Sequence, residues 1–149
     1  MLRVLIADDE SKVCQLIEKL VDWDVLGMEV VAVAENGIEA LEKIKEFHPD
    51  IVIRDIRMPG YDGLDLIRLG KEEAPNTEFV IISGYRHFEY AQMAIRYGVN
   101  AYLLKPIRKD ELTETLKRLS AHFKEQTEQL SLEEKRQRAI RSDEKNLRQ

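Results

Sequence analysis

The sequence predicts an α/β fold, a doubly wound five-stranded parallel sheet with a C-terminal helical extension. Two observations carry this prediction. Short runs rich in β-branched residues, without polar alternation, are typical of strands buried on both faces of a parallel sheet. Between these runs, apolar residues recur at helical spacing, so strands and helices alternate along the chain. Right-handed strand–helix–strand connections then place helices on both faces of the sheet.

Each predicted strand follows from one apolar run. The runs cover residues 4–7, 30–33, 51–53, 79–82 and 101–104.

The first two long helices have clear limits in the sequence. Ser11 is expected to cap the first helix, which ends near Trp23. Asn36 and Gly37 open the next helix, and Pro49 ends it because proline cannot continue the hydrogen-bond ladder. The apolar stripes expected to face the sheet are Val13, Leu16, Ile17 and Leu20 in the first helix and Ile38, Leu41, Ile44 and Phe47 in the second.

Three further helices complete the pattern. A short one follows the turn-rich segment 58–63, another covers the apolar positions from Phe88 to Tyr97, and the last starts near Lys109. Beyond Leu119 the chain becomes polar, and half of the positions that would form the apolar seam of a coiled coil carry polar residues, so the coiled-coil signal is weak. We therefore expect a folded domain over residues 1–119. Residues 120–149 would then be a polar helical extension or linker, partly disordered or self-associating.

The composition is typical of one globular domain with a charged surface. Of 149 residues, 44% are hydrophobic and 34% charged. No apolar run approaches the ~20 residues that a membrane helix needs. The first strand starts almost at Met1, which leaves no room for a signal peptide, so we expect a cytoplasmic protein. The net charge of −5 argues against direct nucleic-acid binding by this segment. The single cysteine, Cys14, cannot form an internal disulfide.

Several predicted strands end beside a residue that phosphoryl chemistry can use. Asp8 and Asp9 follow the first strand, Asp55 the third, Ser83 the fourth and Lys105 the fifth. The carboxyl ends of parallel strands meet at one edge of a sheet, where ligands bind. Each residue alone also has an ordinary explanation as a solvated loop or capping group. Together, the three carboxylates would repel one another without a cation, and Mg²⁺ prefers such oxygen ligands.

The motifs, in this order, resemble the receiver domain of two-component response regulators. They are Asp8–Asp9, residues 51–59 with Gly63, and Lys105–Pro106. The resemblance covers about residues 2–119 and implies a flavodoxin-like (βα)5 fold, the CheY-like receiver fold, with strand order 2-1-3-4-5. Residues 83–85 and 88–91 look most like receivers attached to AraC-type DNA-binding domains.

The resemblance implies a phosphoacceptor and a metal site. Asp55 would accept a phosphoryl group from the histidine of a partner kinase. The metal, Mg²⁺ or Mn²⁺, would be bound by Asp8, Asp9, Asp55 and the backbone carbonyl of Arg57.

The resemblance also implies a switch. Ser83 would turn its hydroxyl toward the phosphoryl group, and Tyr102 would move inward with it. Lys105 would pair with the phosphoryl group, and the peptide bond before Pro106 would be cis.

Two positions depart from the usual pattern of the family. Arg54, just before the acceptor, is larger and more basic than the small residue usual there. The hypothesis is that Arg54 lies over the site and alters partner access or the dephosphorylation rate. Arg86 and His87 stand where relatives often carry acids that cap the next helix, so that helix is expected to begin late or to move easily.

The resemblance names partners and leaves alternatives open. A sensor histidine kinase would be the phosphodonor, and transcription the output. Activated chains would form homodimers through the face of the fourth helix, fifth strand and fifth helix, or through the C-terminal helix. The alternative within signalling is a stand-alone phosphorelay receiver.

Two other classes of function compete with a signalling switch. A phosphohydrolase with an aspartyl nucleophile usually carries a second acid where this chain has Arg57. A purely structural interaction domain would not depend on Asp55. We expect no enzyme acting on external substrates, since a receiver catalyses only its own phosphorylation and dephosphorylation.

Overall fold

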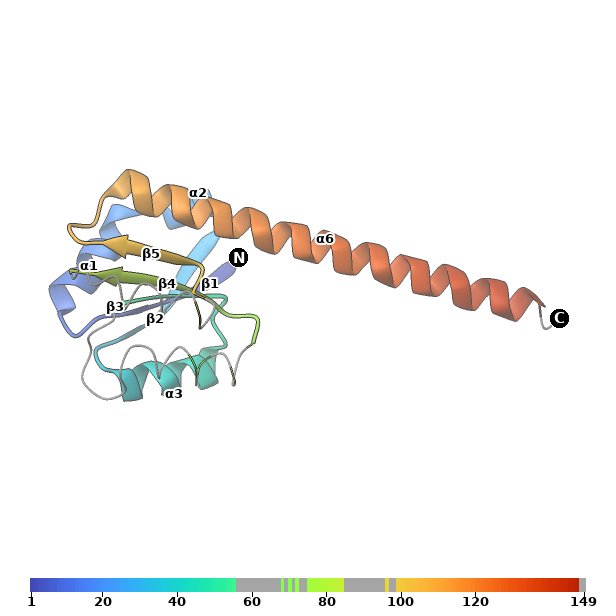
Figure 1. The fold of residues 1–149 in the computed structure, drawn as a ribbon, viewed down its shortest axis with the longest axis horizontal. Coiled ribbons are helices and arrows are strands. Elements are labelled where there is room, and N and C mark those ends of the chain that lie inside the picture. Colours follow the sequence, from blue (N-terminus) through green and yellow to red (C-terminus); the bar gives the residue numbers. More distant parts are fainter. Residues whose placement is uncertain are drawn as a thin grey trace.

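The computed structural model describes residues 1–55, 75–84 and 99–147, together with residues 68, 70, 72 and 96. These residues form a parallel sheet of five strands in the order β2-β1-β3-β4-β5 (Figure 1). The strands are β1 (Leu2–Ala7), β2 (Met28–Ala34), β3 (Ile51–Asp55), β4 (Glu78–Ser83) and β5 (Ala101–Leu104). The predicted fold class and strand order are confirmed.

The helices of the described residues cover both faces of this sheet (Figure 1). They are α1 (Ser11–Leu20), α2 (Trp23–Leu26), α3 (Gly37–Phe47) and α6 (Lys109–Leu147). α3 packs on one face, and α1 and the first turns of α6 pack on the other. The helices predicted after residue 63 and between residues 88 and 97 lie almost entirely outside the described residues.

Burial on both faces explains why the strand sequences lack polar alternation. Along β1, Leu5 and Ala7 join the core cluster beneath α3, and Val4 and Ile6 join the cluster beneath α1 and α6. All four are at most 1% exposed. The period of two along a strand therefore divides one apolar run between two cores.

The structure corrects the predicted first helix at both ends. Ser11 is the first residue of α1 and not its cap, since Glu10 occupies the N-cap position without a side-chain cap bond. The chain becomes extended at Val21, so Trp23 starts a separate short helix. Gly27 ends α2 with a φ of 69°, a left-handed conformation that glycine adopts at little cost.

The limits predicted for α3 are confirmed. The apolar stripes predicted to face the sheet are partly wrong in both α1 and α3. Asn36 caps α3 by accepting a hydrogen bond from the Glu39 amide at 2.8 Å. Leu16 in α1 and Ile38 in α3 were expected to face the sheet, yet they are 47% and 54% exposed. The buried residues are Cys14 and Ile17 in α1 and Gly37, Ala40, Leu41 and Ile44 in α3. A broad apolar stripe does not determine which of its edges faces the sheet.

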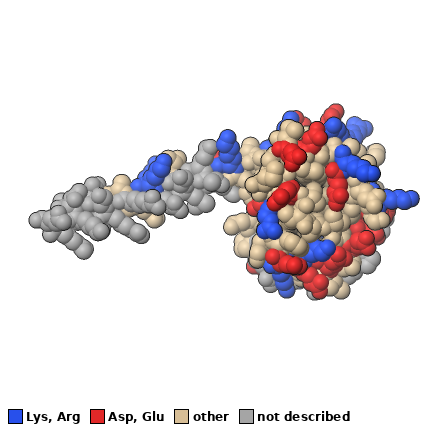
Figure 2. Space-filling view, turned by 180° about the vertical axis from the view of Figure 1, so that it is seen from behind, with Lys and Arg blue, Asp and Glu red and all other residues tan. Residues whose placement is uncertain are grey.

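α6 runs without a break through the domain limit predicted at residue 119. Leu112, Leu116 and Leu119 are buried, and Phe123 packs against the same core cluster. The helix then leaves the globular body and continues to Leu147 (Figures 1 and 2). Within the described part of the chain, no helix is long and apolar enough to span a bilayer.

Candidate functional site

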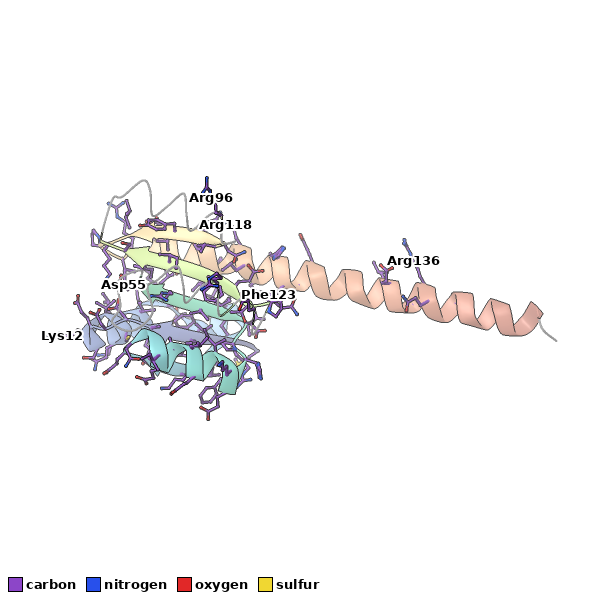
Figure 3. The ribbon with its side chains drawn as sticks, turned by 60° about the horizontal axis from the view of Figure 1, so that its bottom comes forward. Lys12, Asp55, Arg96, Arg118, Phe123 and Arg136 are labelled. Atoms are coloured by element: carbon purple, nitrogen blue, oxygen red, sulfur yellow. The ribbon has the colours of Figure 1, made fainter. Side chains whose placement is uncertain are left out.

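The site lies at the edge of the sheet where the strands reach their carboxyl ends. Asp55 is the last residue of β3 and pairs in register with Ile82 of β4, and Ser83 ends β4. In Figure 3, Asp55 lies at the end of the sheet away from the projecting part of α6. Asp8 and Asp9 directly follow β1, the neighbour of β3 on its other side. The sequence predicted this meeting because the strands are parallel.

Three carboxylates form a compact cluster with one open side. One carboxylate oxygen from each of Asp8, Asp9 and Asp55 lies within 4.8 Å of the others. Asp8 and Asp55 are only 2% and 7% exposed, whereas Asp9 faces solvent. Hard oxygen ligands this close together suit a divalent cation, with Asp9 on the side from which water can complete its coordination. The cluster could therefore hold a metal ion.

Backbone hydrogen bonds hold Asp8 in place. Its amide donates to the carbonyl of Ala34 at 3.0 Å, and its Oδ1 accepts from the amide of Glu10 at 2.9 Å. Burial raises the pKa of the Asp8 carboxyl to about 6, and the nearby Asp55 charge adds to this. The Glu10 amide and the Lys105 charge oppose that rise. Asp8 is thus a poorly solvated carboxylate for which a bound cation would compensate.

Lys105 supplies the positive charge of the cluster. Its Nζ lies 2.7 Å from Asp55 Oδ2 and 3.4 Å from Asp8 Oδ2. Partial burial works to lower the pKa of Lys105, but the hydrogen bond and charge of Asp55, together with Asp8, raise it overall. Its amide donates to the carbonyl of Ser83 at 2.8 Å, which joins the ends of β4 and β5. The lysine therefore remains charged and in contact with the Asp55 carboxylate.

The residues expected to form the switch occupy two different places. Ser83 is fully buried at the end of β4, next to the Lys105 amide. Tyr102 is half-buried on β5 and packs against the core cluster beneath α3. The peptide between Lys105 and Pro106 is cis. Arg57, the fourth expected metal ligand, lies outside the described residues, as do Arg86 and His87.

Arg54 does not lie over the site, contrary to the hypothesis from the sequence. It is 1% exposed and lies on β3 between Ala7 of β1 and Ile81 of β4, which both belong to the core cluster beneath α3. Successive strand residues point to opposite faces, so Arg54 and Asp55 leave the sheet on opposite sides. The guanidinium Nε donates to the backbone carbonyl of Asp55 at 2.7 Å. The sequence could have shown this direction, because side chains alternate between the two faces of the sheet along residues 51–55 and Arg54 falls on the face opposite to Asp55.

The chain is a doubly wound α/β domain in which three acids and a lysine meet at the carboxyl ends of the strands, and these acids could hold a divalent cation. Comparison with known families makes the assignment specific. The family described as response regulator receiver domain matches residues 4–117. The chain belongs to the response regulator receiver family, so the resemblance found in the sequence is confirmed.

Curated relatives and solved structures agree with this assignment. The chain is 40% identical over 126 residues to the transcriptional regulatory protein YesN of Bacillus subtilis, covering 85% of this chain and 34% of that protein. It is 35% identical over 129 residues to the transcriptional regulatory protein HptR of Staphylococcus aureus, covering 87% of this chain and 50% of that protein. The receiver domain of AraT from Geobacillus stearothermophilus matches with a TM-score of 0.81 and 40% identity, covering 85% of this chain and 98% of that one. The chain thus spans half or less of the length of these curated relatives.

Proposed function

We propose that this chain is the phosphoacceptor switch of a two-component response regulator. Asp55 accepts a phosphoryl group from a histidine of a sensor kinase in a reaction that requires Mg²⁺ or Mn²⁺. The contact between Asp55 Oδ2 and Lys105 Nζ, 2.7 Å long within a cluster of three carboxylates, is the observation that carries the proposal. The contact places the Asp55 carboxylate, the nucleophile, beside the Lys105 ammonium, which can pair with the negative charge of the phosphoryl group.

The transfer is a substitution at phosphorus. An oxygen of Asp55 forms the new P–O bond while the P–N bond to the kinase histidine breaks, and the bonding electrons stay with the imidazole. Asp8, Asp9 and Asp55 would hold the metal ion, which would supply positive charge to neutralise the phosphoryl oxygens. Lys105 moves its hydrogen bond from the carboxylate to a phosphoryl oxygen, and Ser83 donates its hydroxyl to another.

The signal then passes to the face of the fourth helix, the fifth strand and the fifth helix, of which the structure describes β5 and the start of α6. Ser83 and Lys105 belong to the ends of adjacent strands, joined by the 2.8 Å backbone bond, so a shift of one displaces the other. Tyr102 on β5 follows Ser83 inward, which shifts a pre-existing equilibrium between two conformations. Homodimers form on activation through this face or through α6.

The output we propose is transcription, in a cytoplasmic regulator whose DNA-binding domain is of the AraC type. Two relatives named as transcriptional regulatory proteins are longer than this chain, which supports the proposal. The net charge of −5 supports DNA contacts through another part of the regulator and not through this chain. The domain modifies only itself and has no other substrate.

Intact-mass measurement tests the phosphoacceptor. Incubation with Mg²⁺ and acetyl phosphate or phosphoramidate should add one group of about 80 Da, and the Asp55→Asn variant should lack it. Asp50→Asn is the matched control, because Asp50 lies just before β3, at the opposite edge of the sheet, where it accepts from the Arg3 amide. Asp50→Asn should be phosphorylated like the wild type. No adduct on the wild type, or an adduct on Asp55→Asn, would contradict the proposal.

A further inference from the structure

The end of β3 has a hydrogen bond that the parallel ladder does not supply. Pairing between β1 and β3 stops at Ala7 and Arg54, one residue before the acceptor. Pairing with β4 continues to Asp55 opposite Ile82. Beyond the β1 ladder, the carbonyl of Asp55 accepts from the Nε of Arg54 at 2.7 Å. A side chain of the strand itself thus holds the peptide that follows the acceptor.

This bond is strong and belongs to a buried charge. A guanidinium N–H that donates to a carbonyl is a charge-assisted hydrogen bond, stronger than a bond between neutral groups. Arg54 is 1% exposed, in a strand whose preceding residues are Ile51, Val52 and Ile53. Burying a cation in such a strand costs stability. Features that break a local rule in this way are expected at functional sites.

We propose that Arg54 is a positioning residue for phosphoryl transfer at Asp55, acting from the face of the sheet opposite the acid cluster. Its bond to the Asp55 carbonyl limits rotation of the peptide plane at the strand end. By holding the carbonyl of Asp55, the bond restrains the backbone from which the Asp55 side chain reaches Lys105 and the other two acids. The inference rests on the proposed function and adds a residue to its machinery.

Arg54 is also placed to connect the acceptor with the switch aromatic. The strand register puts Arg54, Ile81 and Tyr102 in one row across β3, β4 and β5. Ile81 and Tyr102 belong to, or pack against, the core cluster beneath α3, the face that receives Arg54. Neighbouring strands lie about 4.8 Å apart, and only Ile81 on β4 lies between Arg54 on β3 and Tyr102 on β5 in this row. An inward movement of Tyr102 therefore takes place in the row that contains Arg54.

Three substitutions at Arg54 separate its possible contributions. Arg54→Met removes both charge and donor, Arg54→Gln keeps an N–H donor without charge, and Arg54→Lys keeps charge without the planar fork. The first readout is the Mg²⁺ dissociation constant, measured by calorimetry on the unphosphorylated protein. The second is the phosphorylation rate with phosphoramidate at saturating Mg²⁺. Val52→Ala is the matched control, because it weakens the same core on the same face of β3 without touching Asp55.

We expect Arg54→Met to weaken Mg²⁺ binding and to slow phosphorylation, each by about tenfold, as for other residues that orient a metal ligand. At least one of Arg54→Gln and Arg54→Lys should restore both values to within about threefold of the wild type. Val52→Ala should lower the melting temperature and leave both values unchanged.

Two results would overturn the inference. One is an Arg54→Met protein with wild-type Mg²⁺ affinity and rate. The other is an equal loss in all three variants that Val52→Ala reproduces, which would make Arg54 a packing residue only. The Mg²⁺ measurement does not require phosphorylation, so it decides the role of Arg54 even if the wild type accepts no phosphoryl group. That last outcome would contradict the proposed function, and the Mg²⁺ affinities would still show whether Arg54 positions Asp55 for metal binding.

Discussion

Asp8 is a carboxyl group whose ionisation opposes folding. Burial raises its pKa from the ordinary 3.8 to about 6, so the folded state binds the proton more tightly than the unfolded state. Stability from this group is therefore complete below about pH 4, falls between pH 4 and pH 6, and is lost above that range. A metal ion at the cluster would offset the loss.

The Asp8→Asn variant should accordingly be more stable than the wild type at neutral pH without Mg²⁺. We expect the free energy of unfolding to rise by about 1–2 kcal/mol at pH 7.5, with a much smaller difference at pH 4. The asparagine can still accept the hydrogen bond from the Glu10 amide, so the loop after β1 should keep its structure. Urea titrations at the two pH values measure this, and an equal difference at both would contradict the assignment.

Binding of Mg²⁺ should depend on pH through the same group. A metal ion needs the deprotonated carboxylate, so affinity should fall by about tenfold between pH 7.5 and pH 5, across the raised pKa of Asp8. Calorimetric titration of Mg²⁺ at several pH values measures the effect. In Asp8→Asn the affinity should be lower and its pH dependence flatter. An identical pH profile in the two proteins would assign the effect to another residue.

The Lys105 ammonium partly neutralises the negative charge of the acid cluster. Replacing Lys105 with methionine removes the charge that lies 2.7 Å from Asp55 and 3.4 Å from Asp8. The melting temperature should fall without metal, because the acids then repel one another with less compensation. The increase in melting temperature on adding Mg²⁺ should be larger than in the wild type. Thermal scans with and without Mg²⁺ test this, and an equal or smaller increase would contradict it.

Among the secondary-structure elements, α1 and α3 show how far local sequence determines a helix start. Asn36 caps α3 through its side chain, whereas Ser11 lies inside α1, after an N-cap residue, Glu10, that makes no side-chain cap bond. Asn36→Ala should cost about 1 kcal/mol of unfolding free energy, while Ser11→Ala should change it by less than about 0.5 kcal/mol. Chemical denaturation of the two variants provides the measurement. Equal losses would mean that both side chains cap.

Strands and site were predictable from the sequence for one physical reason. A parallel sheet buries both faces of its strands, so strands appear as unbroken apolar runs, and the residues after them meet at one edge. Asp8, Asp55 and Lys105 were found in this way. The direction of Arg54 was missed because the third run was taken to end at Ile53, although the strand continues to Asp55.

The helix details depended on packing that the sequence alone does not specify. Leu16 and Ile38 fit an apolar stripe by spacing, but smaller or better-placed neighbours such as Cys14 and Ala40 are the ones buried. Val21 breaks the first predicted helix by becoming extended, although no proline or glycine precedes Trp23. How well each side chain packs against the sheet determines which residues are buried and where the helix ends. The spacing of apolar residues in the sequence carries no information on this packing.

For the molecule as a whole, α6 belongs partly to the folded body and partly to the extension. Phe123 packs against the core cluster, and His122 Nδ1 lies 3.4 Å from Glu78 Oε1 at the start of β4. Two contacts with the folded body, those of His122 and Phe123, therefore lie beyond the domain limit predicted at residue 119. Whether residues 1–119 are as stable as the longer chain stays a prediction.

Two truncations test where the folded unit ends. A chain ending at residue 124 should unfold with nearly the same free energy as the full chain. A chain ending at Leu119 should lose about 1–2 kcal/mol, because it lacks the buried part of Phe123. Urea unfolding of the three proteins gives the comparison. Equal stability of both truncations would place the limit at residue 119.

The length of α6 would let it act as a lever that begins close to the site. Its first residue, Lys109, follows Lys105 by only four positions. In Figure 3, Phe123 lies where the helix leaves the body, and Arg136 lies far out along it. The stretch from Phe123 to Leu147 is about 36 Å long, so a tilt of roughly 10° at Phe123 would displace its far end by about 6 Å. An ångström-scale adjustment around Asp55 could thereby become a displacement as wide as one turn of helix, delivered to whatever the far end touches.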